Sequence, residues 1–301
     1  MNHISNIINQ PSGHQNFDFV DIDIDKDNML FIDPCLIEVG TSSFCKKANR
    51  IMQDCMDHLV DLYKNHTDDK VKLSFYNHMH EINYTKLGYG NGRNGKAKTA
   101  WGMLETLSGL QQLVDKNVNI SRPIDIPIMI KGFAEDCMSD MLTNMLFEEI
   151  NSFTLKQCEK YGLPKQRCRE VCYYWDVKSH VWKRYQGDVL CLDGQIILLV
   201  PKEIVRRTYY YNTEQFFRKI VLERIQQDRV EYDRDGREIK PTKKSLQQEL
   251  LHTYSDIREI SVDKTIERPD LLDNHHRQMA NMYAGRQLSD TELDFYVYQG
   301  S

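Results

Sequence analysis

Two aspartates four residues apart are the first candidates for chemistry in this sequence. Asp136 and Asp140 stand in the stretch Lys131-Gly-Phe-Ala-Glu-Asp-Cys-Met-Ser-Asp140, which is typical of a turn that leads into a helix. A spacing of four places both carboxylates on one face of a helix. Such a pair could hold Mg²⁺, which is usually bound by one or two carboxylates together with substrate phosphate. The alternative is helix capping, in which acids accept from free backbone amides and complement the helix dipole.

A lysine just past an apolar run is the second candidate. Lys202 ends the phrase Leu198-Leu-Val-Pro-Lys202. In a restriction-type nuclease, a lysine that follows a buried strand stabilises charge on the phosphate or orients water beside a metal. The acid that usually stands two residues earlier is missing, because this position is Val200. Asp176-Val-Lys178 matches the acid-x-lysine pattern, but a hairpin turn with solvated charges explains that triplet more simply.

The third candidate is a basic loop, residues 86–100, in which cations alternate with glycines. Glycines let backbone amides approach a phosphate, and lysine and arginine neutralise it. The Gly-Lys-Ser/Thr ending of a Walker A loop is absent, so the pattern indicates nucleic-acid contact rather than a nucleotide-binding P-loop. A flexible surface connector is the alternative interpretation. The cations that would contact nucleic acid are Lys86, Arg93, Lys96 and Lys98.

Composition limits the classes of protein to consider. The 301 residues suffice for one large domain or two small ones. The net charge is −5, from 44 acidic and 39 basic side chains, so the overall charge does not indicate a polyanionic partner. A local basic patch is still compatible with this charge. The eight cysteines are scattered without a CxxC pair, which is typical of reduced thiols. The polar start lacks a secretory signal, and no apolar run could span a membrane, so we expect a cytoplasmic protein.

The elements that would position these residues follow from periodicity and from turn residues. We expect a disordered arm over 1–16, and a strand over 17–25 because Val20, Ile22 and Ile24 share one face. Apolar residues at helical spacing predict a helix from Ser42 or Ser43 to about residue 64. The isoleucine-rich run 124–130 is predicted to be an edge or bulged strand, since it contains a proline.

The middle of the chain is rich in predicted strands. They cover 171–175, 181–185, 188–192 and 195–200, with Asp193-Gly194 as a hairpin turn. Before them, a helix to about Tyr161 should end at Gly162; after them, Asn212 should cap another helix. The predicted fold class is therefore α/β, a mixed sheet flanked by helices, with a polar and partly helical extension. The expected domains are a core over 17–228 and a polar C-terminal region over 229–301.

Several phrases resemble a family of bacterial proteins, mainly uncharacterised, that is associated with mobile elements and phage-defence-type loci. The resemblance covers about residues 28–222 and implies a defence context without a mechanism. The phrases that carry it are Leu30-Phe-Ile-Asp-Pro34, Leu87-Gly-Tyr-Gly90, Gly132 with Asp136 and Ser139-Asp-Met-Leu-Thr-Asn144, Phe153-Thr with Gln157-Cys158, and Ile197-Leu-Leu-Val-Pro-Lys-Glu-Ile-Val205.

Together these features predict an antiviral-defence effector, a Mg²⁺-dependent nuclease acting on DNA or RNA. Asp136 and Asp140 would hold the metal, Lys202 would act on the phosphate, and the basic loop would grip the backbone. This site requires that strands 124–130 and 195–200 be parallel neighbours, so that their ends open at one edge. The alternative is a non-catalytic adaptor that binds DNA or a partner ATPase of the same defence locus. A structural subunit of an oligomer is a third interpretation.

Overall fold

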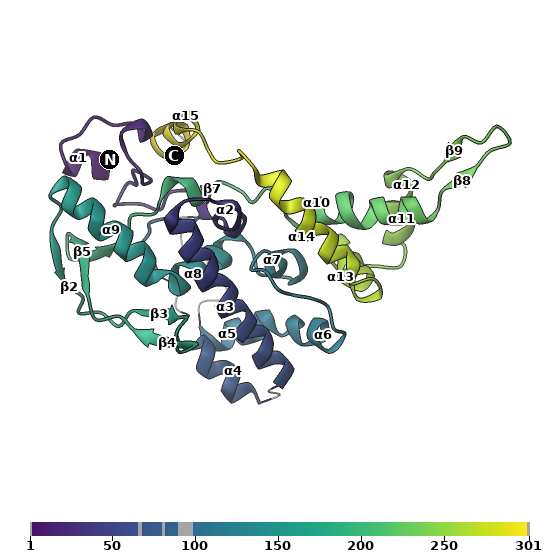
Figure 1. Cartoon of the computed structure of the whole chain (residues 1–301), viewed down its shortest axis with the longest axis horizontal. Helices are drawn as coiled ribbons and strands as arrows, with labels where there is room; N and C mark the ends of the chain where they lie inside the picture. The colour runs from purple at the N-terminus through teal and green to yellow at the C-terminus, as the bar shows by residue number, and fades with distance from the viewer. Residues whose placement is uncertain (1, 66–67, 80–81, 90–98, 300–301) are drawn as a thin grey trace.

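The computed structural model describes residues 2–65, 68–79, 82–89 and 99–299, and Figure 1 shows their arrangement. The chain forms a body, residues 2–212, from which a C-terminal region, residues 213–299, projects before its end returns to the body. No described helix is both long enough and apolar enough to cross a membrane.

A long helix, α3 (Ser43–Asn65), lies at the centre of the body. The side chains of Met52, Cys55, Met56 and Leu59 are fully buried, as their helical spacing predicted. Ser42 Oγ accepts from the Cys45 backbone N–H at 3.1 Å, which confirms the predicted start. The helix contacts β3 (Tyr173–Asp176) and five other helices, namely α2 (Pro34–Val39), α4 (Asp69–Tyr76), α6 (Gly109–Asp115), α8 (Glu135–Met145) and α9 (Phe147–Tyr161).

The class is mixed α/β, as predicted, and its strands lie in small antiparallel sheets flanked by helices instead of in one large sheet. The four strands predicted in the middle of the chain are present. Asp193 and Gly194 both have positive φ, 49° and 80°, as a tight hairpin turn requires. The sheets are β1 (Phe31–Ile32) with β7 (Val205–Arg206), β2 (Lys165–Arg167) with β5 (Asp188–Leu192) and β6 (Gln195–Ile197), β3 with β4 (Val181–Arg184), and β8 (Glu231–Tyr232) with β9 (Glu238–Ile239).

The strand predicted over 124–130 is wrong, because the run forms the short helix α7 (Asp125–Met129). All five of its residues are buried, so the apolar run reflects burial on every side. Asp125 Oδ2 accepts from the backbone N–H groups of Ser121 and Arg122, which fixes the start of the helix. Pro127 stands in the first turn, where a missing N–H costs a helix nothing.

The N-terminal segment differs from both of its predictions. Residues 2–16 form α1 (Ile4–Ile7) and a 3₁₀ turn, η1 (His14–Asn16), and are not a disordered arm, since Ile4 and His14 are fully buried. Residues 17–25 form no ladder and make two isolated bridges, between Phe19 and Pro201 and between Asp23 and His3. Both faces of this segment are buried, so its alternation did not separate an inner from an outer side.

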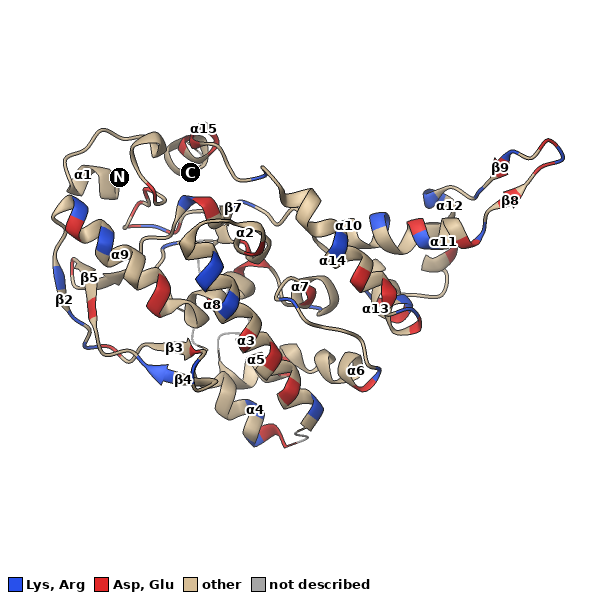
Figure 2. Cartoon of the chain, viewed as in Figure 1, with Lys and Arg blue, Asp and Glu red and all other residues tan. Residues whose placement is uncertain are grey.

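The C-terminal region is mostly helical. Its hairpin, β8–β9, projects away from the body and carries charges of both signs (Figures 1 and 2). The helices over 213–228 pack on the later helices α12, α13 and α14. Although the expected boundary at 228 assigned them to the core, they therefore belong with the C-terminal region. Its elements, besides the hairpin, are α10 (Thr213–Phe216), η4 (Phe217–Val221), α11 (Leu222–Asp228), α12 (Lys243–Leu251), α13 (Ile257–Glu267), α14 (Asp270–Tyr283), α15 (Asp290–Asp294) and η5 (Phe295–Gln299).

Candidate functional site

The predicted metal ligands Asp136 and Asp140 lie one turn apart on α8, as their spacing indicated. The helix is fixed to β1 because the Ile32 backbone N–H donates to Ser139 Oγ at 3.1 Å. Gly88 has a φ of 142°, and a Cβ there would lie 3.0 Å from Asp136 Oδ1. Glycine at position 88 therefore lets the root of the basic loop approach this carboxylate closely.

Two tyrosines, Tyr89 and Tyr209, lie near Glu135 and Asp136 at the start of α8. The Tyr89 ring packs on Phe31 with a centroid distance of 4.7 Å, and the Tyr209 hydroxyl donates to the Ile32 carbonyl oxygen at 2.7 Å. Burial, together with the nearby Glu135 and Asp136 carboxylates, raises the pKa of Tyr89. The surface at the start of α8 is thus acidic and aromatic.

The basic loop is described only at its root. Lys86 is buried, and its ammonium donates to Gln195 Oε1 at 2.9 Å. Its backbone carbonyl accepts from the Asn28 backbone N–H at 2.7 Å. Lys86 therefore anchors the loop to β6 and does not lie on an open surface. The predicted phosphate contacts Arg93, Lys96 and Lys98 lie outside the described residues.

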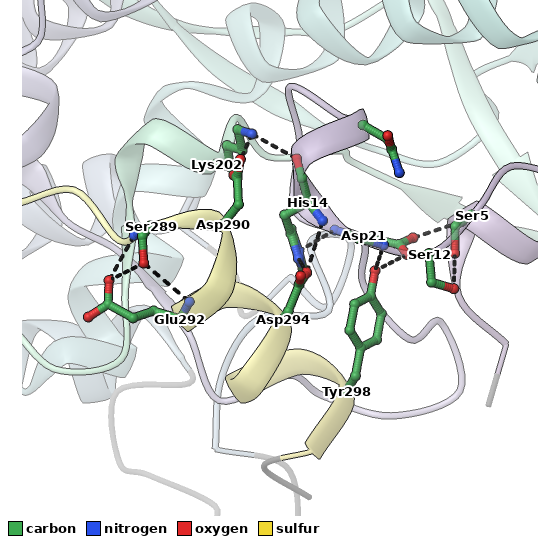
Figure 3. A network of polar contacts seen from close by, with 12 residues as sticks. Ser5, Ser12, His14, Asp21, Lys202, Ser289, Asp290, Glu292, Asp294 and Tyr298 are labelled. Carbon is green, nitrogen blue, oxygen red and sulfur yellow. Dashed lines mark hydrogen bonds and ion pairs between the residues drawn. The ribbon is translucent and has the colours of Figure 1, made fainter.

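Lys202 is not brought to the carboxylates by the predicted route. The run 124–130 is helical, and β6 pairs antiparallel with β5, so the pair of parallel strands does not exist. The Lys202 ammonium instead donates to Asp290 Oδ1 at 2.6 Å and to the His14 carbonyl oxygen at 2.7 Å (Figure 3). Within the described part of the chain, no three His, Cys, Asp or Glu side chains are placed to hold a metal ion.

Lys202 belongs to a set of polar contacts that joins the two ends of the chain, here called the terminal clasp. Figure 3 shows its side chains pointing toward one another from the N-terminal segment, η3 (Lys202–Ile204), α15 and η5. The Tyr298 hydroxyl donates to Asp21 Oδ2 at 2.7 Å. The clasp consists of His14, Asp21, Lys202, Asp290, Asp294 and Tyr298.

The clasp contains an Asp–His pair, Asp294 and His14, that holds segments of the chain together and has no free nitrogen for catalysis. The Asp21 backbone N–H donates to His14 Nε2 at 3.1 Å, so the proton lies on Nδ1 and is donated to Asp294 Oδ1 at 2.7 Å. Burial lowers the pKa of His14 despite the neighbouring carboxylate. A general base needs a free ring nitrogen that faces its substrate. Because both nitrogens of His14 are used internally, this pair fastens the chain ends.

A cluster of cations near β7 was missed by sequence reasoning. Three of them surround the half-buried Tyr210 ring: Arg206 Cζ at 5.9 Å, Lys219 Nζ at 5.1 Å and Arg286 Cζ at 5.4 Å from its centroid. Beside them, Arg207 Cζ lies 5.1 Å from the Tyr296 centroid. The pair Arg206-Arg207 and the three tyrosines after it are visible in the sequence, but the other cations come from later segments.

Arg206, one of the four cations of this Tyr210 cluster, lies close enough to the Asp33 and Glu292 carboxyl groups for its charge to act to lower the pKa of each. Among the residues that the structure describes, none of Arg206, Arg207, Lys219 and Arg286 forms an ion pair. Hydrogen bonds and ring contacts hold these cations in place; the Arg206 guanidinium, for instance, donates to the Arg286 carbonyl oxygen. Cation–π contacts of this kind attract guanidinium and ammonium groups to the face of the ring.

The chain was also compared with known proteins. A family model described as a domain of unknown function, DUF8370, matches residues 9–212, which is more than half of the chain. No curated protein and no solved structure matches. The matched segment contains α8, β7 and Lys202, whereas two cations of the Tyr210 cluster, Lys219 and Arg286, lie beyond it.

Proposed function

We propose that this chain, which belongs to the DUF8370 family, binds nucleic acid through its phosphate backbone without cleaving it, as an adaptor in a defence locus. The observation that carries this proposal is the Tyr210 cluster. Lysine and arginine side chains that neutralise phosphates release counterions, and this supplies most of non-specific nucleic-acid binding. The defence context comes from the family resemblance, and a partner ATPase remains the other predicted partner.

The arrangement of the cluster supports a polyanion as its ligand. Three cations within 6 Å of one ring repel one another, and the face of Tyr210 offsets only part of that repulsion. Phosphate oxygens would offset the rest and would accept from guanidinium groups in the bidentate manner that arginine favours. The chain carries a net charge of −5, so a phosphate backbone would have to bind at a local group of cations such as this one.

The test is the salt dependence of binding to a DNA duplex and to single-stranded RNA. Replacing Arg206, Arg207, Lys219 and Arg286 together by glutamine should lower the slope of log K against log salt by about 3, since each lost contact removes about 0.7–0.9. The charge-matched control replaces four exposed cations of α3, namely Lys46, Lys47, Arg50 and Lys64. An unchanged slope in the cluster variant, or an equal loss in the control, would refute the proposal.

A second candidate function is the Mg²⁺-dependent nuclease, and one observation favours it. The root of the basic loop lies beside Asp136: a Cβ at position 88, whose φ of 142° favours glycine, would lie 3.0 Å from Asp136 Oδ1. In this candidate Asp136 and Asp140 hold Mg²⁺ together with phosphate oxygens of the substrate, and Arg93, Lys96 and Lys98 contact the backbone. Lys202 has no part in it, because its ammonium is bound within the terminal clasp.

Cleavage assays separate the two candidates. Purified protein is incubated with DNA or RNA and Mg²⁺ or Mn²⁺, and Asp136→Asn/Asp140→Asn is compared with the unaltered chain. If the adaptor proposal holds, both proteins bind and neither cleaves. Cleavage by the unaltered chain that disappears in a folded double variant would establish the nuclease instead.

A further inference from the structure

A cavity of about 670 Å³ lies between the body and α13. This is within the range of about 300–1,000 Å³ that is typical of sites for small organic molecules. One wall comes from α5 (Ala100–Leu107), α6 and the turn before α8, all inside the segment that matches the family. The other wall is the start of α13, which lies beyond that segment. The cavity therefore exists only where the C-terminal region meets the body.

The lining combines apolar side chains with one half-buried cation. Leu113, Met129, Ile130 and Val262 provide apolar surface. Arg258 also lines the cavity; its Nε and Nη2 groups donate to Thr213 Oγ1, at 3.1 and 2.7 Å. Within the described part of the chain, Arg258 forms no ion pair and its Nη1 group makes no hydrogen bond. Burial lowers the pKa of this guanidinium, which shows that its charge is poorly solvated.

The two acids at the rim, Asp256 and Glu259, accept hydrogen bonds from groups at the start of α13. Asp256 Oδ1 accepts from the backbone N–H groups of Arg258 and Glu259, each at 2.9 Å, and its Oδ2 pairs with Lys131 Nζ at 3.3 Å. Glu259 Oε2 accepts from the N–H and the hydroxyl of Ser255, at 2.8 and 2.6 Å. These bonds hold both carboxylates in the helix cap. A half-buried cation that forms no ion pair among the described residues then faces a cavity with an apolar wall of Leu113, Met129, Ile130 and Val262. The charge of Asp256 acts on Arg258, and Lys131 also lines the cavity.

We propose that this cavity binds a small organic monoanion with an apolar body. Its carboxylate, sulfonate or phosphate-ester group would accept from Arg258, and its body would cover Leu113, Ile130 and Val262. Charge-assisted bonds to arginine are strong where water is excluded. Glu105, which also lines the cavity, disfavours ligands that carry more than one negative charge. The occupant would contact both walls and so tie the C-terminal region to the body, independently of nucleic-acid binding.

The probe is 8-anilinonaphthalene-1-sulfonate, a monoanion with an apolar body that fluoresces when shielded from water. Titration of the full chain should give one saturable site, and octanoate should displace the probe while octylamine should not. Arg258→Gln should weaken probe binding at least tenfold. The control Arg277→Gln removes an equal charge from an exposed position on α14 and should leave binding unchanged.

A second variant guards against a folding effect of Arg258→Gln, since this side chain also bonds Thr213 and the Pro127 carbonyl. Val262→Trp fills the cavity and keeps the guanidinium, so it should abolish probe binding without lowering the melting temperature. Undiminished probe affinity in Val262→Trp would place the probe elsewhere on the surface and overturn the proposal. Equal displacement by octylamine and octanoate would overturn the assignment of an anion.

Discussion

Two of the places at which the C-terminal region is attached to the body use different contacts; α10 and α13 also pack on α7. At the first, the α14 seam, α14 packs on α2 through fully buried side chains, among them Met279, whose Sδ accepts from Cys35 Sγ at 3.2 Å, and Tyr283. At the second, the terminal clasp, α15 and η5 are held by hydrogen bonds and ion pairs. The Asp290 and Asp294 side chains there are 40% and 36% exposed, whereas Asp21 is buried. One attachment is mainly apolar and the other mainly polar.

Both attachments bury ionisable groups: His14 and Asp21 in the clasp, and two histidines and an aspartate at the α14 seam. His276 Nε2 lies 2.7 Å from Asp125 Oδ1, and both side chains are buried. His275 is fully buried and stacks on Tyr211 at 4.1 Å; neither of its ring nitrogens has a hydrogen-bond partner among the described residues. Burial lowers the pKa of His275 to about 3.

The difference assigns the two attachments different roles. Burying apolar surface contributes about 25 cal/mol per Å², whereas a partly exposed ion pair contributes about 0–1 kcal/mol. We therefore expect the seam to hold the C-terminal region in place and the clasp to open first, as a local event within a folded molecule. The Tyr210 cluster and the cavity both depend on the seam, because each takes residues from both sides of it.

The largest effect is expected at the seam. Met279→Ala removes a fully buried side chain that contacts Cys35 of α2, and such a change costs about 2–5 kcal/mol through lost burial and the cavity left behind. Urea denaturation should show this decrease in the free energy of unfolding. Leu251→Ala, on the exposed side of α12, is the control and should cost less than about 0.5 kcal/mol. Equal effects of the two changes would show that the seam is not the main attachment.

The next effect is a change in pH dependence at the same seam. His275 has a pKa of about 3 in the folded chain and 6.5 as its ordinary value, so the unfolded chain binds the proton more readily. Stability is therefore complete above pH 6.5 and falls as the pH drops toward 3. Its loss at pH 5 is about 2 kcal/mol, since each unit below 6.5 costs about 1.4 kcal/mol.

His275→Phe should remove this loss and keep the stacking on Tyr211. The measurement is the difference in unfolding free energy between the variant and the unaltered chain at several pH values. Taking the difference cancels Asp33, whose pKa burial raises to about 7 and whose contribution falls as the pH rises from 3.8 to 7. His252→Phe, at an exposed position after α12, is the control. A difference that does not vary with pH would contradict this account of the seam.

A smaller effect is expected from Asp294→Ala in the clasp. Asp294 Oδ1 accepts from the His14 Nδ1–H at 2.7 Å and from the His14 backbone N–H at 2.9 Å. Losing bonds to a charged group costs about 1–3 kcal/mol. We expect the loss to appear as faster amide exchange in residues 2–16 and 290–299, with the seam unchanged. Thr291→Ala, one turn away and exposed, should leave exchange as it is. Faster exchange throughout α14 would show that the attachments are not independent.

The parts of the fold that were predicted correctly rest on local signals. The apolar spacing of Met52, Cys55, Met56 and Leu59 predicts a helix with one buried face, and Asp193-Gly194 predicts a turn that needs positive φ. Likewise, Asn212 accepts from the Gln215 backbone N–H at 3.0 Å, as a capping residue should. Each of these features depends on residues close together in the chain, so propensity and periodicity were sufficient.

The parts of the fold and of the site that were not predicted depend on residues far apart in the chain, or on segments that are buried on all sides. An isoleucine-rich run fits a buried strand and a buried helix equally, so 124–130 was assigned the wrong type. His14 and Asp294 are separated by 280 positions, and no local pattern connects them. The same holds for the Tyr210 cluster, whose cations converge only after folding. Both predicted carboxylates share a helix face near the basic loop, while Lys202 required a strand arrangement that the chain does not form.

The smallest effect is expected from Lys202→Met, and it separates a fastening role from a catalytic one. The Lys202 side chain is 26% exposed and its partner Asp290 is 40% exposed, so water screens the pair. Its removal should cost about 1 kcal/mol or less, and the cost should shrink at high salt, where the screening length falls to about 3 Å. Denaturation at low and high salt measures both quantities. Nucleic-acid binding by the variant should equal that of the unaltered chain, because the ammonium is bound to Asp290 and to the His14 carbonyl. A nuclease activity that falls by orders of magnitude in this variant, at unchanged stability, would return Lys202 to a catalytic site and make the clasp part of it.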